Sequence, residues 1–328
     1  MLDNAILFSL SANQSLAASI AKKLHVKLGE RTINRFPSGE TIVEPVDTVR
    51  GKQVFIIQST CPPVNENLME VLIFVDALKR ASAKEINLII PYFGYARQDR
   101  KAKPRQPITA ALVAHLLTTA GVNRVVTVNL HAAQIQGFFT CLVDDLTAVP
   151  LLGKSIAKER NNDFSNLVVV SPDHGGVNRA RVLAEQWDTP IAIIDKRRNS
   201  NLEPEAMNII GDVCGKDCFM IDDMIDTARS ACIGAHALKK AGAKSVSIMT
   251  VHPVFSDPAY ELLKDGPFDS IVVTNSIPLD ERFNNLPNIK VISLASMLAE
   301  CIERITKNAP LSAVYDAYAT PESLKLNS

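Results

Sequence analysis

The chain has 328 residues, with 35 basic and 35 acidic side chains. This length exceeds what one hydrophobic core usually supports, so we expect two domains, and the balanced charge excludes an overall field that would hold nucleic acid or an anionic membrane. Because no apolar run approaches the roughly 18 residues of a membrane helix and no basic segment opens the chain, we expect a cytoplasmic protein. The six scattered cysteines contain no CxxC pair, which argues against a zinc site or a disulfide framework.

The first candidate binding element in chain order is the loop at residues 36–40. Phe36 offers a ring that can stack on a nucleobase. The amides of Ser38 and Gly39, together with the Glu40 carboxylate, can contact ring nitrogens or ribose hydroxyls. Taken alone, this short motif does not establish a nucleotide site.

The second candidate element follows the predicted strand at residues 86–90. Residues 97–105 contain five basic side chains and one acid, which together make a local trap for a polyphosphate. Gly94 and Pro104 interrupt the run, so we expect an exposed loop that closes over a ligand, although a run of charge is more often a solvated face. The side chains available for stacking on a base are those of Tyr92, Phe93, Tyr95 and Arg97. A polyphosphate and a base together indicate a nucleotide.

Three more segments place polar residues after predicted strands. His131 follows the apolar run at 125–130, and a buried histidine with satisfied hydrogen bonds is its simplest interpretation. Asp173 follows another strand, where a carboxylate can hold magnesium and the glycines after it let a phosphate approach. The strand at 191–194 ends in Asp195 and three cations, which can stabilise charge in phosphoryl transfer.

The most informative segment joins a predicted strand to a predicted helix in the second half. The apolar run 218–221 predicts a buried strand, and residues 231–241, closed by Gly242, predict a helix. The residues between them are therefore expected to form a loop at a strand's carboxyl end. Thr227 and Ser230 lie where the helix begins, and the unpaired amides and helix dipole there favour a phosphate.

Two carboxylates in the same segment indicate a second kind of ligand group. Asp222 and Asp223 would repel a phosphate, but ionised carboxylates accept hydrogen bonds from sugar hydroxyls or from the water shell of a divalent ion. A segment that suits both a polyol and a phosphate indicates a sugar phosphate. The plain alternative is that the Asp pair caps a helix and that the hydroxyls are solvated.

The two halves of the chain repeat one pattern. The strand, helix and strand at residues 55–90 return at residues 219–251, an offset of about 160 residues, so two copies of one α/β unit are the simplest account. Alternating strands and helices predict parallel sheets with helices on both faces and with ligands at the carboxyl ends of the strands.

The repeat also suggests where the domains begin and end. We place an N-terminal domain at 1–150 and a C-terminal domain at 151–310, because Pro150 and a turn-rich stretch fall near the start of the second copy. The helical stretch at 294–305 can pack on either half. The tail at 311–328 is rich in proline and polar residues, so we expect it to contribute little to the core.

Together these segments resemble the ribose-phosphate pyrophosphokinases, the phosphoribosyl pyrophosphate synthase family, nearly end to end. The motifs that carry the resemblance lie at residues 36–40, 59–63, 91–101, 131, 134–139, 171–173, 194–198 and 222–227. The resemblance implies two tandem phosphoribosyltransferase-like domains, each a mainly parallel sheet flanked by helices. It also implies a magnesium-dependent transfer of diphosphate from ATP to the 1-hydroxyl group of ribose 5-phosphate, with AMP as the other product.

The same resemblance implies a role for each segment. ATP would be bound by Phe36, Ser38, Gly39, Glu40, Arg97 and Gln98. Mg²⁺ would be held by His131 and Asp173, and Lys196 would be the catalytic residue. Ribose 5-phosphate would be bound by Arg198, Asp222, Asp223, Asp226, Thr227, Ala228, Arg229 and Ser230. A homo-oligomer, typically a hexamer, is also implied, because the ATP site of this family takes residues from a neighbouring subunit.

The chain departs from the family pattern at several of these positions. Asn129 and Thr140 stand where the family usually has Asp, which removes two carboxylates near the magnesium. Ala228 and Arg229 replace two glycines, and a residue with a Cβ restricts the positive φ and the close backbone approach that glycine allows. These changes favour an alternative, a poorly active or non-catalytic paralogue that regulates an active synthase. A base-transferring phosphoribosyltransferase shares the sugar-phosphate segment but leaves the loop at 97–105 unexplained.

Arg229 is the departure that is simplest to test. If its guanidinium supplies a phosphate contact in place of glycine, Arg229→Gly should weaken the binding of ribose 5-phosphate and raise its Michaelis constant. Steady-state kinetics at saturating ATP measure the change. An unchanged or lower Michaelis constant would contradict this contact.

Overall fold

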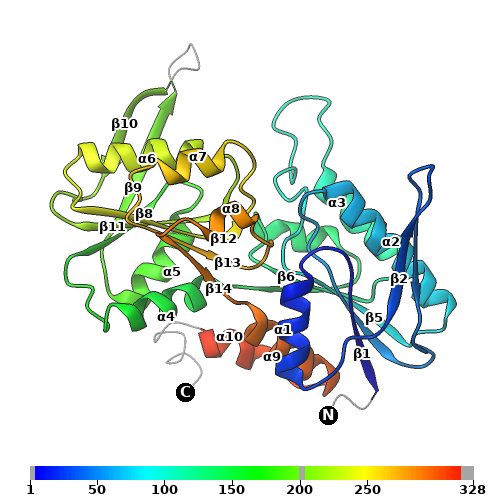
Figure 1. Cartoon of the computed structure of the whole chain (residues 1–328). Coiled ribbons are helices and arrows are strands. Elements are labelled where there is room, and N and C mark those ends of the chain that lie inside the picture. The colour runs from blue at the N-terminus through cyan, green and yellow to red at the C-terminus, as the bar shows by residue number, and fades with distance from the viewer. Residues whose placement is uncertain (1–3, 199–203, 319–328) are drawn as a thin grey trace. The chain divides into compact units, whose positions relative to one another are not determined.

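The computed structural model describes residues 4–198 and 204–318, and it divides into two compact units (Figure 1). The first unit comprises the chain up to Leu146 together with residues 276–278 and 293–315. The second unit comprises residues 147–275, residues 279–292 and the chain after Tyr315. Each unit is built around its own mainly parallel sheet flanked by helices, which confirms the predicted fold class.

The sheet of the first unit has five parallel strands in the order β1-β4-β5-β6-β7. These strands are β1 (Ala5–Ser9), β4 (Gln53–Ile57), β5 (Glu85–Ile90), β6 (Arg124–Val128) and β7 (Leu142–Leu146). A separate antiparallel hairpin consists of β2 (Arg31–Arg35) and β3 (Thr41–Pro45). The helical segments are α1 (Gln14–Leu24), α2 (Val64–Arg80), α3 (Thr109–Ala120), the 3₁₀ helix η1 (Ala133–Phe138), α9 (Ala295–Thr306) and α10 (Ser312–Tyr318).

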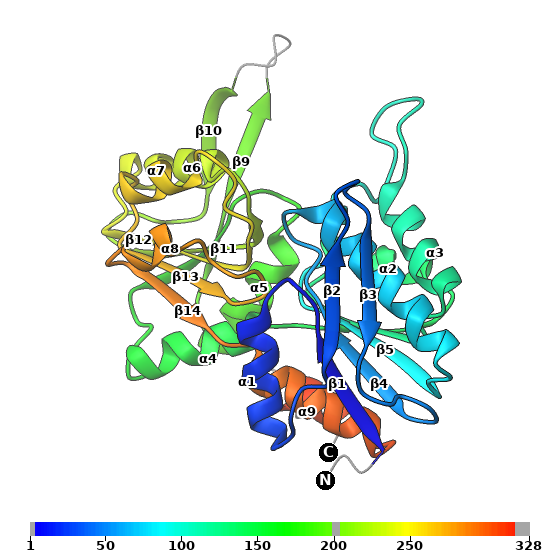
Figure 2. The same ribbon diagram turned by 45° about the vertical axis from the view of Figure 1, so that its right-hand side comes forward.

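Both faces of this sheet are buried, because parallel strands are joined by helices that cover each face. Residues 54–57 of β4, for example, are all fully buried. On one face Phe8 of β1 packs edge to face against Phe74 of α2, with ring centroids 5.1 Å apart. On the other face α1 and α9 lie side by side, as both views show (Figure 2).

The sheet of the second unit has seven strands in the order β10-β9-β8-β11-β12-β13-β14. These strands are β8 (Leu167–Ser171), β9 (Ile191–Arg198), β10 (Pro204–Ile210), β11 (Asp217–Ile225), β12 (Ser245–Pro253), β13 (Ser270–Thr274) and β14 (Ile289–Ile292). Only β10 runs antiparallel to its neighbour. The helices are α4 (Val149–Glu159), α5 (Val177–Trp187), α6 (Arg229–Lys240), α7 (Ala259–Lys264) and α8 (Glu281–Asn284).

The two sheets share one topology. The order β1-β4-β5-β6-β7 is matched strand for strand by β8-β11-β12-β13-β14, and in each unit a hairpin precedes the second of these strands. The hairpin is β2–β3 in the first unit and β9–β10 in the second. The connection β4–α2–β5 therefore occupies the same place as β11–α6–β12, as the sequence repeat indicates.

Residues 293–315, near the end of the chain, return to the first unit. The domain limits predicted from the sequence, 1–150 and 151–310, differ from the compact units here, because α9 packs on α1 and residues 293–315 belong to the first unit. Residues 319–328 of the predicted tail lie outside the described residues, but the described start of the tail contributes to the core. In α10, Val314 is 1% exposed, and the Tyr315 hydroxyl donates to the backbone oxygen of Asp145 at 3.3 Å.

The sequence led us to expect neither a membrane helix nor a disulfide framework. Among the residues that the structure describes, no helix combines the length and the apolar character needed to cross a membrane. All six cysteines are in the described part of the chain, and each is a free thiol.

The contact between Phe8 and Phe74 gives a stability prediction. Phe74→Ala should destabilise the protein by about 3–5 kcal/mol, because it leaves a cavity in a fully buried region. Met69→Ala on the same helix is the matched control, since that side chain is 49% exposed and its loss should change stability by about 0.5 kcal/mol or less. Urea unfolding followed by circular dichroism measures both values. Equal effects of the two substitutions would contradict the packing.

Candidate functional site

β11 carries two of the predicted sugar-phosphate carboxylates, and it is longer than the sequence predicts. The strand spans Asp217–Ile225, so Asp222 and Asp223 lie in the strand and the expectation of a loop from residue 222 is wrong. The physical reason is that β12 continues beside β11 as far as Pro253, and backbone pairing holds the chain extended. Only residues 226–228 separate the strand from α6.

One guanidinium group, which the sequence analysis did not single out, holds both carboxylates. Arg179 in the first turn of α5 places Nη1 3.1 Å from Oδ1 of Asp222 and Nη2 3.1 Å from Oδ1 of Asp223. The side chains of Arg179, Asp222 and Asp223 are 17%, 33% and 7% exposed. Arg179 lies 43 residues before Asp222, and only the fold joins them. The sequence contained only an indirect signal for this arginine. Two adjacent carboxylates beside an apolar strand require a cation, but the pair does not show which element supplies it.

The carboxylate pair has an unusual titration behaviour. Burial raises the pKa of Asp222, and the negative charge of Asp223 raises it further, whereas Arg179 lowers it. The backbone amide of Asp223 also donates to Oδ1 of Asp222 at 2.8 Å. Two acids beside one guanidinium offer carboxyl oxygens, which suit sugar hydroxyls or a cation rather than a phosphate.

The start of α6 has the geometry of an anion site. Asp226 and Thr227 are half-buried, and Ala228 next to them has φ 61° and ψ −3°, which is the left-handed conformation. Ala228 thus adopts the positive φ that its Cβ was expected to prevent, at an energetic cost of roughly 1–2 kcal/mol. Arg229 and Ser230 are exposed in the first turn of α6, where unpaired backbone amides favour a phosphate.

Asp173 lies in the loop between β8 and α5. The amide of Gly176 donates to its Oδ1 at 3.0 Å, and the Ser171 hydroxyl donates to its backbone oxygen at 2.7 Å. A Cβ at Gly176 would lie 2.9 Å from Oγ of Ser171, so this close approach requires glycine. Nε2 of the exposed His174 lies 3.1 Å from Oδ1 of Asp195 on β9. These contacts fix the loop while leaving the Asp173 side chain exposed.

Lys196 and Arg198 occupy the end of β9. Their backbones pair with β10, with Lys196 opposite Met207 and Arg198 opposite Pro204. Their side chains lie outside the described part of the structure, as do residues 199–203. The roles expected for both residues stay predictions.

The predicted ATP loop of the first unit is the tip of the β2–β3 hairpin. The amide of Gly39 donates to the oxygen of Phe36, and the amide of Phe36 donates to the oxygen of Glu40, both at 2.8 Å. Gly39 has φ 92°, a conformation that residues with a Cβ rarely adopt. The Ser38 hydroxyl donates to Oε2 of Glu40 at 2.7 Å. Phe36 is 52% exposed, as a stacking surface requires.

The basic segment at 97–105 is an exposed loop, as the sequence predicts (Figure 1, between β5 and α3). All five of its basic side chains, including that of Arg97, are exposed. The base of the loop is held in place, because Oε1 of Gln98 accepts from the Thr109 hydroxyl at 2.5 Å. Asp99 accepts from Nε2 of Gln134 at 2.6 Å.

Two of the expected stacking residues beside this loop are unavailable. Tyr92 and Phe93 are 7% and 2% exposed, so the prediction that either ring stacks on a base is wrong. They directly follow a strand whose two faces are buried, and Phe93 packs against Phe139 with ring centroids 5.6 Å apart. Tyr95 is half-buried and donates its hydroxyl to Asn65.

His131 lies in the loop after β6 and is exposed, rather than buried as the sequence suggested. The amide of Leu130 donates to Oδ1 of Asp145 at 3.1 Å, and the amide of Asn129 donates to the oxygen of Leu146 at 2.8 Å. Asn129 has φ 47°, so the chain turns sharply here. Burial raises the pKa of Asp145 to about 6, although the amide of Leu130 opposes the shift. Two hydrogen bonds to β7 thus fix the loop that carries His131.

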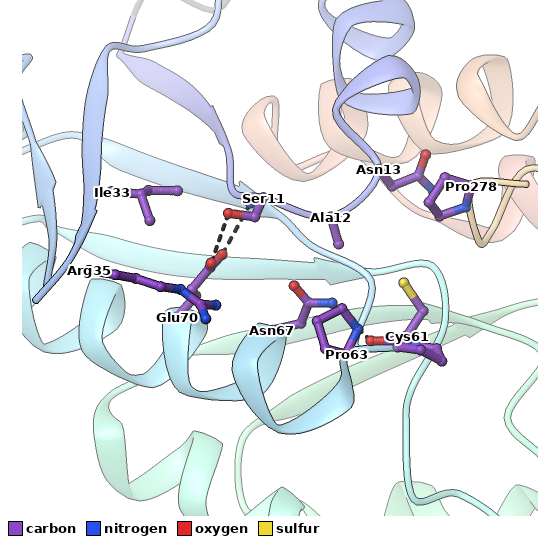
Figure 3. Close-up of a pocket in the computed structure, with 11 residues that line it drawn as sticks. Ser11, Ala12, Asn13, Ile33, Arg35, Cys61, Pro63, Asn67, Glu70 and Pro278 are labelled. Carbon is purple, nitrogen blue, oxygen red and sulfur yellow. Dashed lines mark hydrogen bonds between the residues drawn. The ribbon is translucent and has the colours of Figure 1, made fainter. Parts of the chain in front are cut away.

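A pocket of ≈ 460 Å³ lies at the carboxyl ends of β1 and β4 in the first unit (Figure 3). In the shared topology, this edge corresponds to the β8–β11 edge of the second unit. The Glu70 side chain in the pocket is 2% exposed and accepts from the amide and hydroxyl of Ser11 at 3.1 and 2.8 Å and from Nε2 of Gln58 at 3.2 Å. None of the site residues predicted from the sequence lines this pocket.

Protein ligands for a metal are sparse. Within the described ranges, no group of three or more His, Cys, Asp or Glu side chains is placed to hold a metal ion. Mg²⁺ usually needs only one or two protein carboxylates, because water and substrate phosphates fill its other positions. The exposed Asp173 at the end of β8 fits that pattern. His131 offers a nitrogen, which magnesium prefers less, while Asn129 and the exposed Thr140 offer neutral oxygens.

The predicted residues therefore form two groups. The second unit joins the carboxylates of β11 to the anion-binding start of α6, which suits a sugar phosphate. The first unit carries the hairpin tip, the basic loop and His131, which suit a nucleotide. His131 belongs to the first unit and Asp173 to the second, so the contacts of each residue are described separately.

Known proteins are similar to this chain over most of its length. Family models match residues 5–121 as the N-terminal domain of ribose phosphate pyrophosphokinase and residues 198–316 as a phosphoribosyl synthetase-associated domain. A ribose-phosphate pyrophosphokinase from Fusobacterium nucleatum is 54% identical over 314 residues, 96% of this chain and 99% of that protein. One from Chromobacterium violaceum is 49% identical over 315 residues, 96% of this chain and 95% of that protein. The crystal structure of phosphoribosylpyrophosphate synthetase from Mycobacterium smegmatis has a TM-score of 0.88 and 41% identity, covering 93% of this chain and 100% of that one.

Asp145→Asn tests the effect of burying a carboxylate beside the His131 loop. The pKa of Asp145 is about 6 in the folded protein and ordinarily 3.8, so its stabilising contribution is complete below the lower value and is lost as pH rises through the upper one. The variant keeps an oxygen for the Leu130 amide but carries no charge. It should be more stable than the wild type by about 1–2 kcal/mol at pH 7.5, with an advantage that shrinks as pH falls toward about 4. Thermal unfolding across this range measures the difference. A wild type at least as stable at pH 7.5 would contradict the expectation.

Proposed function

This chain belongs to the ribose-phosphate pyrophosphokinase family, and from that premise we propose how its residues carry out the reaction. The enzyme transfers diphosphate from ATP to the 1-hydroxyl group of ribose 5-phosphate, which gives phosphoribosyl pyrophosphate and AMP. The observation that carries this function is the near-complete coverage of relatives at about half identity, which also confirms the resemblance noted in the sequence.

Ribose 5-phosphate binds at the carboxyl edge of the second sheet. The carboxylates of Asp222 and Asp223 accept hydrogen bonds from the ribose hydroxyls, and Asp226 adds a third acid to the same edge. The amides of residues 227–230 bind the 5-phosphate at the start of α6. Two neighbouring features support this arrangement. The paired acids lie at the end of β11, and the start of α6, which suits an anion, follows after only three residues.

ATP binds to the first unit. The exposed ring of Phe36 stacks on the adenine, and Ser38, Gly39 and Glu40 contact its nitrogens or the ribose. Arg97 and Gln98 begin the exposed basic loop, whose cations neutralise the triphosphate.

The transfer needs positioning and charge neutralisation rather than covalent catalysis. The 1-hydroxyl oxygen attacks the β-phosphorus while AMP leaves, and negative charge moves onto the leaving phosphate. Lys196 is the catalytic cation, and Arg198 binds the sugar phosphate beside it. Mg²⁺, held by Asp173 and His131, would supply further positive charge to the phosphates when bound.

We propose that the active form is a homo-oligomer, a hexamer, and its mass in solution tests this proposal. Phe36 stands at the tip of a projecting hairpin, in a position from which it can reach a nucleotide bound by another copy of the chain. A location in the cytoplasm stays a prediction from the sequence.

The alternative function is a poorly active or non-catalytic paralogue that regulates an active synthase. Its main support was the replacement of two glycines in the sugar-phosphate loop. Ala228 nevertheless adopts a left-handed conformation of the kind that glycine allows. This observation favours the enzyme.

The direct test incubates the purified protein with ATP, ribose 5-phosphate, Mg²⁺ and inorganic phosphate. AMP and phosphoribosyl pyrophosphate should form in equal amounts, and neither should form without ribose 5-phosphate. Lys196→Ala should lower kcat by about 100-fold or more, because it removes charge from the transferring group. Lys216→Ala is the control, since Lys216 precedes β11 at the opposite edge of the sheet.

Two results would decide against the enzyme. One is the absence of AMP from a folded preparation, and the other is release of ADP in its place. A protein that makes no AMP but changes the rate of an active relative when mixed with it would establish the regulatory alternative.

A further inference from the structure

The position of Arg179 differs from that of an ordinary ion pair. Its guanidinium bridges two carboxylates that are adjacent in the chain, with one nitrogen 3.1 Å from each. Arg179 and Asp223 are largely buried, so solvent screens this contact much less than a surface pair. The bridge lies at the carboxyl edge of the second sheet, which is the edge that carries the sugar-phosphate site proposed above.

A second ion pair on β11, between Arg160 and Asp217, provides a comparison. At the amino end of β11, Asp217 receives Nη2 of Arg160 at 3.2 Å and the Ser245 hydroxyl at 2.7 Å. That single acid is balanced by one cation and one hydroxyl. At the carboxyl end, one guanidinium contacts two adjacent acids. Partly buried like charges repel, so bringing these two carboxyl groups together costs free energy that a purely structural contact does not require.

We propose that Arg179 is a positioning residue, which holds the Asp222 and Asp223 carboxylates as one rigid acceptor for the hydroxyl groups of ribose 5-phosphate. This inference rests on the proposed function of the site. Each carboxylate uses Oδ1 for Arg179, so the direction of each carboxyl plane is fixed before the sugar arrives. A fixed acceptor loses less conformational freedom on binding than two side chains that rotate independently.

The bridge also connects two loops of the site. Arg179 is in the first turn of α5, which begins directly after the loop of Asp173, and Gly176 in that loop donates its amide to Asp173. A Cβ at Gly176 would lie 3.5 Å from Nη1 of Arg179, so the guanidinium rests closely on the loop. Arg179 therefore ties the candidate magnesium loop to the sugar carboxylates of β11.

Charge supports the same role. Burial and mutual repulsion raise the pKa of Asp222, and Arg179 is the group that opposes the rise. A protonated carboxyl group loses one acceptor position and gains a donor. The guanidinium therefore limits the protonation of Asp222 without abolishing it, because the pKa is still raised to about 8.

The test compares three variants. Arg179→Met removes the charge and the fork while keeping a long side chain, and Arg179→Lys keeps the charge without the fork. Arg160→Met is the matched control, because it breaks an ion pair with the opposite end of β11. Thermal unfolding establishes first that each variant is folded.

We expect the substitution to change the Michaelis constant of ribose 5-phosphate much more than that of ATP. Arg179→Met should raise the Michaelis constant of ribose 5-phosphate about tenfold or more while changing that of ATP less than about twofold. Arg179→Lys should recover part of the loss, and Arg160→Met should leave both constants near those of the wild type. Equal rises for both substrates, or no change for ribose 5-phosphate, would overturn the inference.

Direct binding separates this inference from the proposed function. Calorimetry of ribose 5-phosphate should show the same loss of affinity in Arg179→Met as the kinetics, and Asp222→Asn added to Arg179→Met should cause little further loss. Losses that simply add would overturn the idea of one acceptor unit. If the wild type binds ribose 5-phosphate but makes no AMP, the proposed reaction fails while the binding comparison still decides the role of Arg179.

Discussion

Parallel strand pairing is the constraint on which the rest of this structure depends. Parallel neighbours must be joined by crossover helices, and those helices bury both faces of the sheet. Apolar side chains therefore fill the strands, as in residues 54–57 of β4, and polar chemistry is confined to the edges. In each sheet the loops that follow parallel strands emerge at one edge. Arg97 and His131 follow strands of the first sheet in this way, and Asp173 follows a strand of the second.

The balanced charge of the chain conceals two local fields of opposite sign. The loop at 97–105 is basic and exposed, so its charges act through solvent and weaken with salt. The acids at the end of β11 are partly buried and retain most of their mutual repulsion. A triphosphate and a sugar present opposite requirements, and the two fields match the ligands proposed for the two units. The balanced composition therefore gave no sign of the separate sites.

Sequence reasoning predicted the parallel α/β fold and the exposed basic loop because both depend on local patterns. Apolar runs, glycines and charge clusters are visible within about ten residues of chain. The length of β11 was missed, because its last residues are held extended by pairing with β12 rather than by their own preferences. Arg179 was missed for a similar reason, since no local motif connects it to a strand 43 residues later. The buried Tyr92 and Phe93 were misread because aromatic residues in a loop motif suit a ligand and a core equally well.

The return of α9 and α10 to the first unit has a consequence for the order of folding on the ribosome. Residues 295–306 supply the helix that packs against α1, and Val314 completes a nearby part of the core. The first half of the chain emerges early but lacks these segments until almost the whole protein has been made. Domains generally fold as units during synthesis, from the N-terminus onward. Here residues 147–275 and 279–292 of the second unit are synthesised before the first unit has all its parts, so the N-terminal half waits for residues 293–315, with apolar surface on α1 left for them to cover.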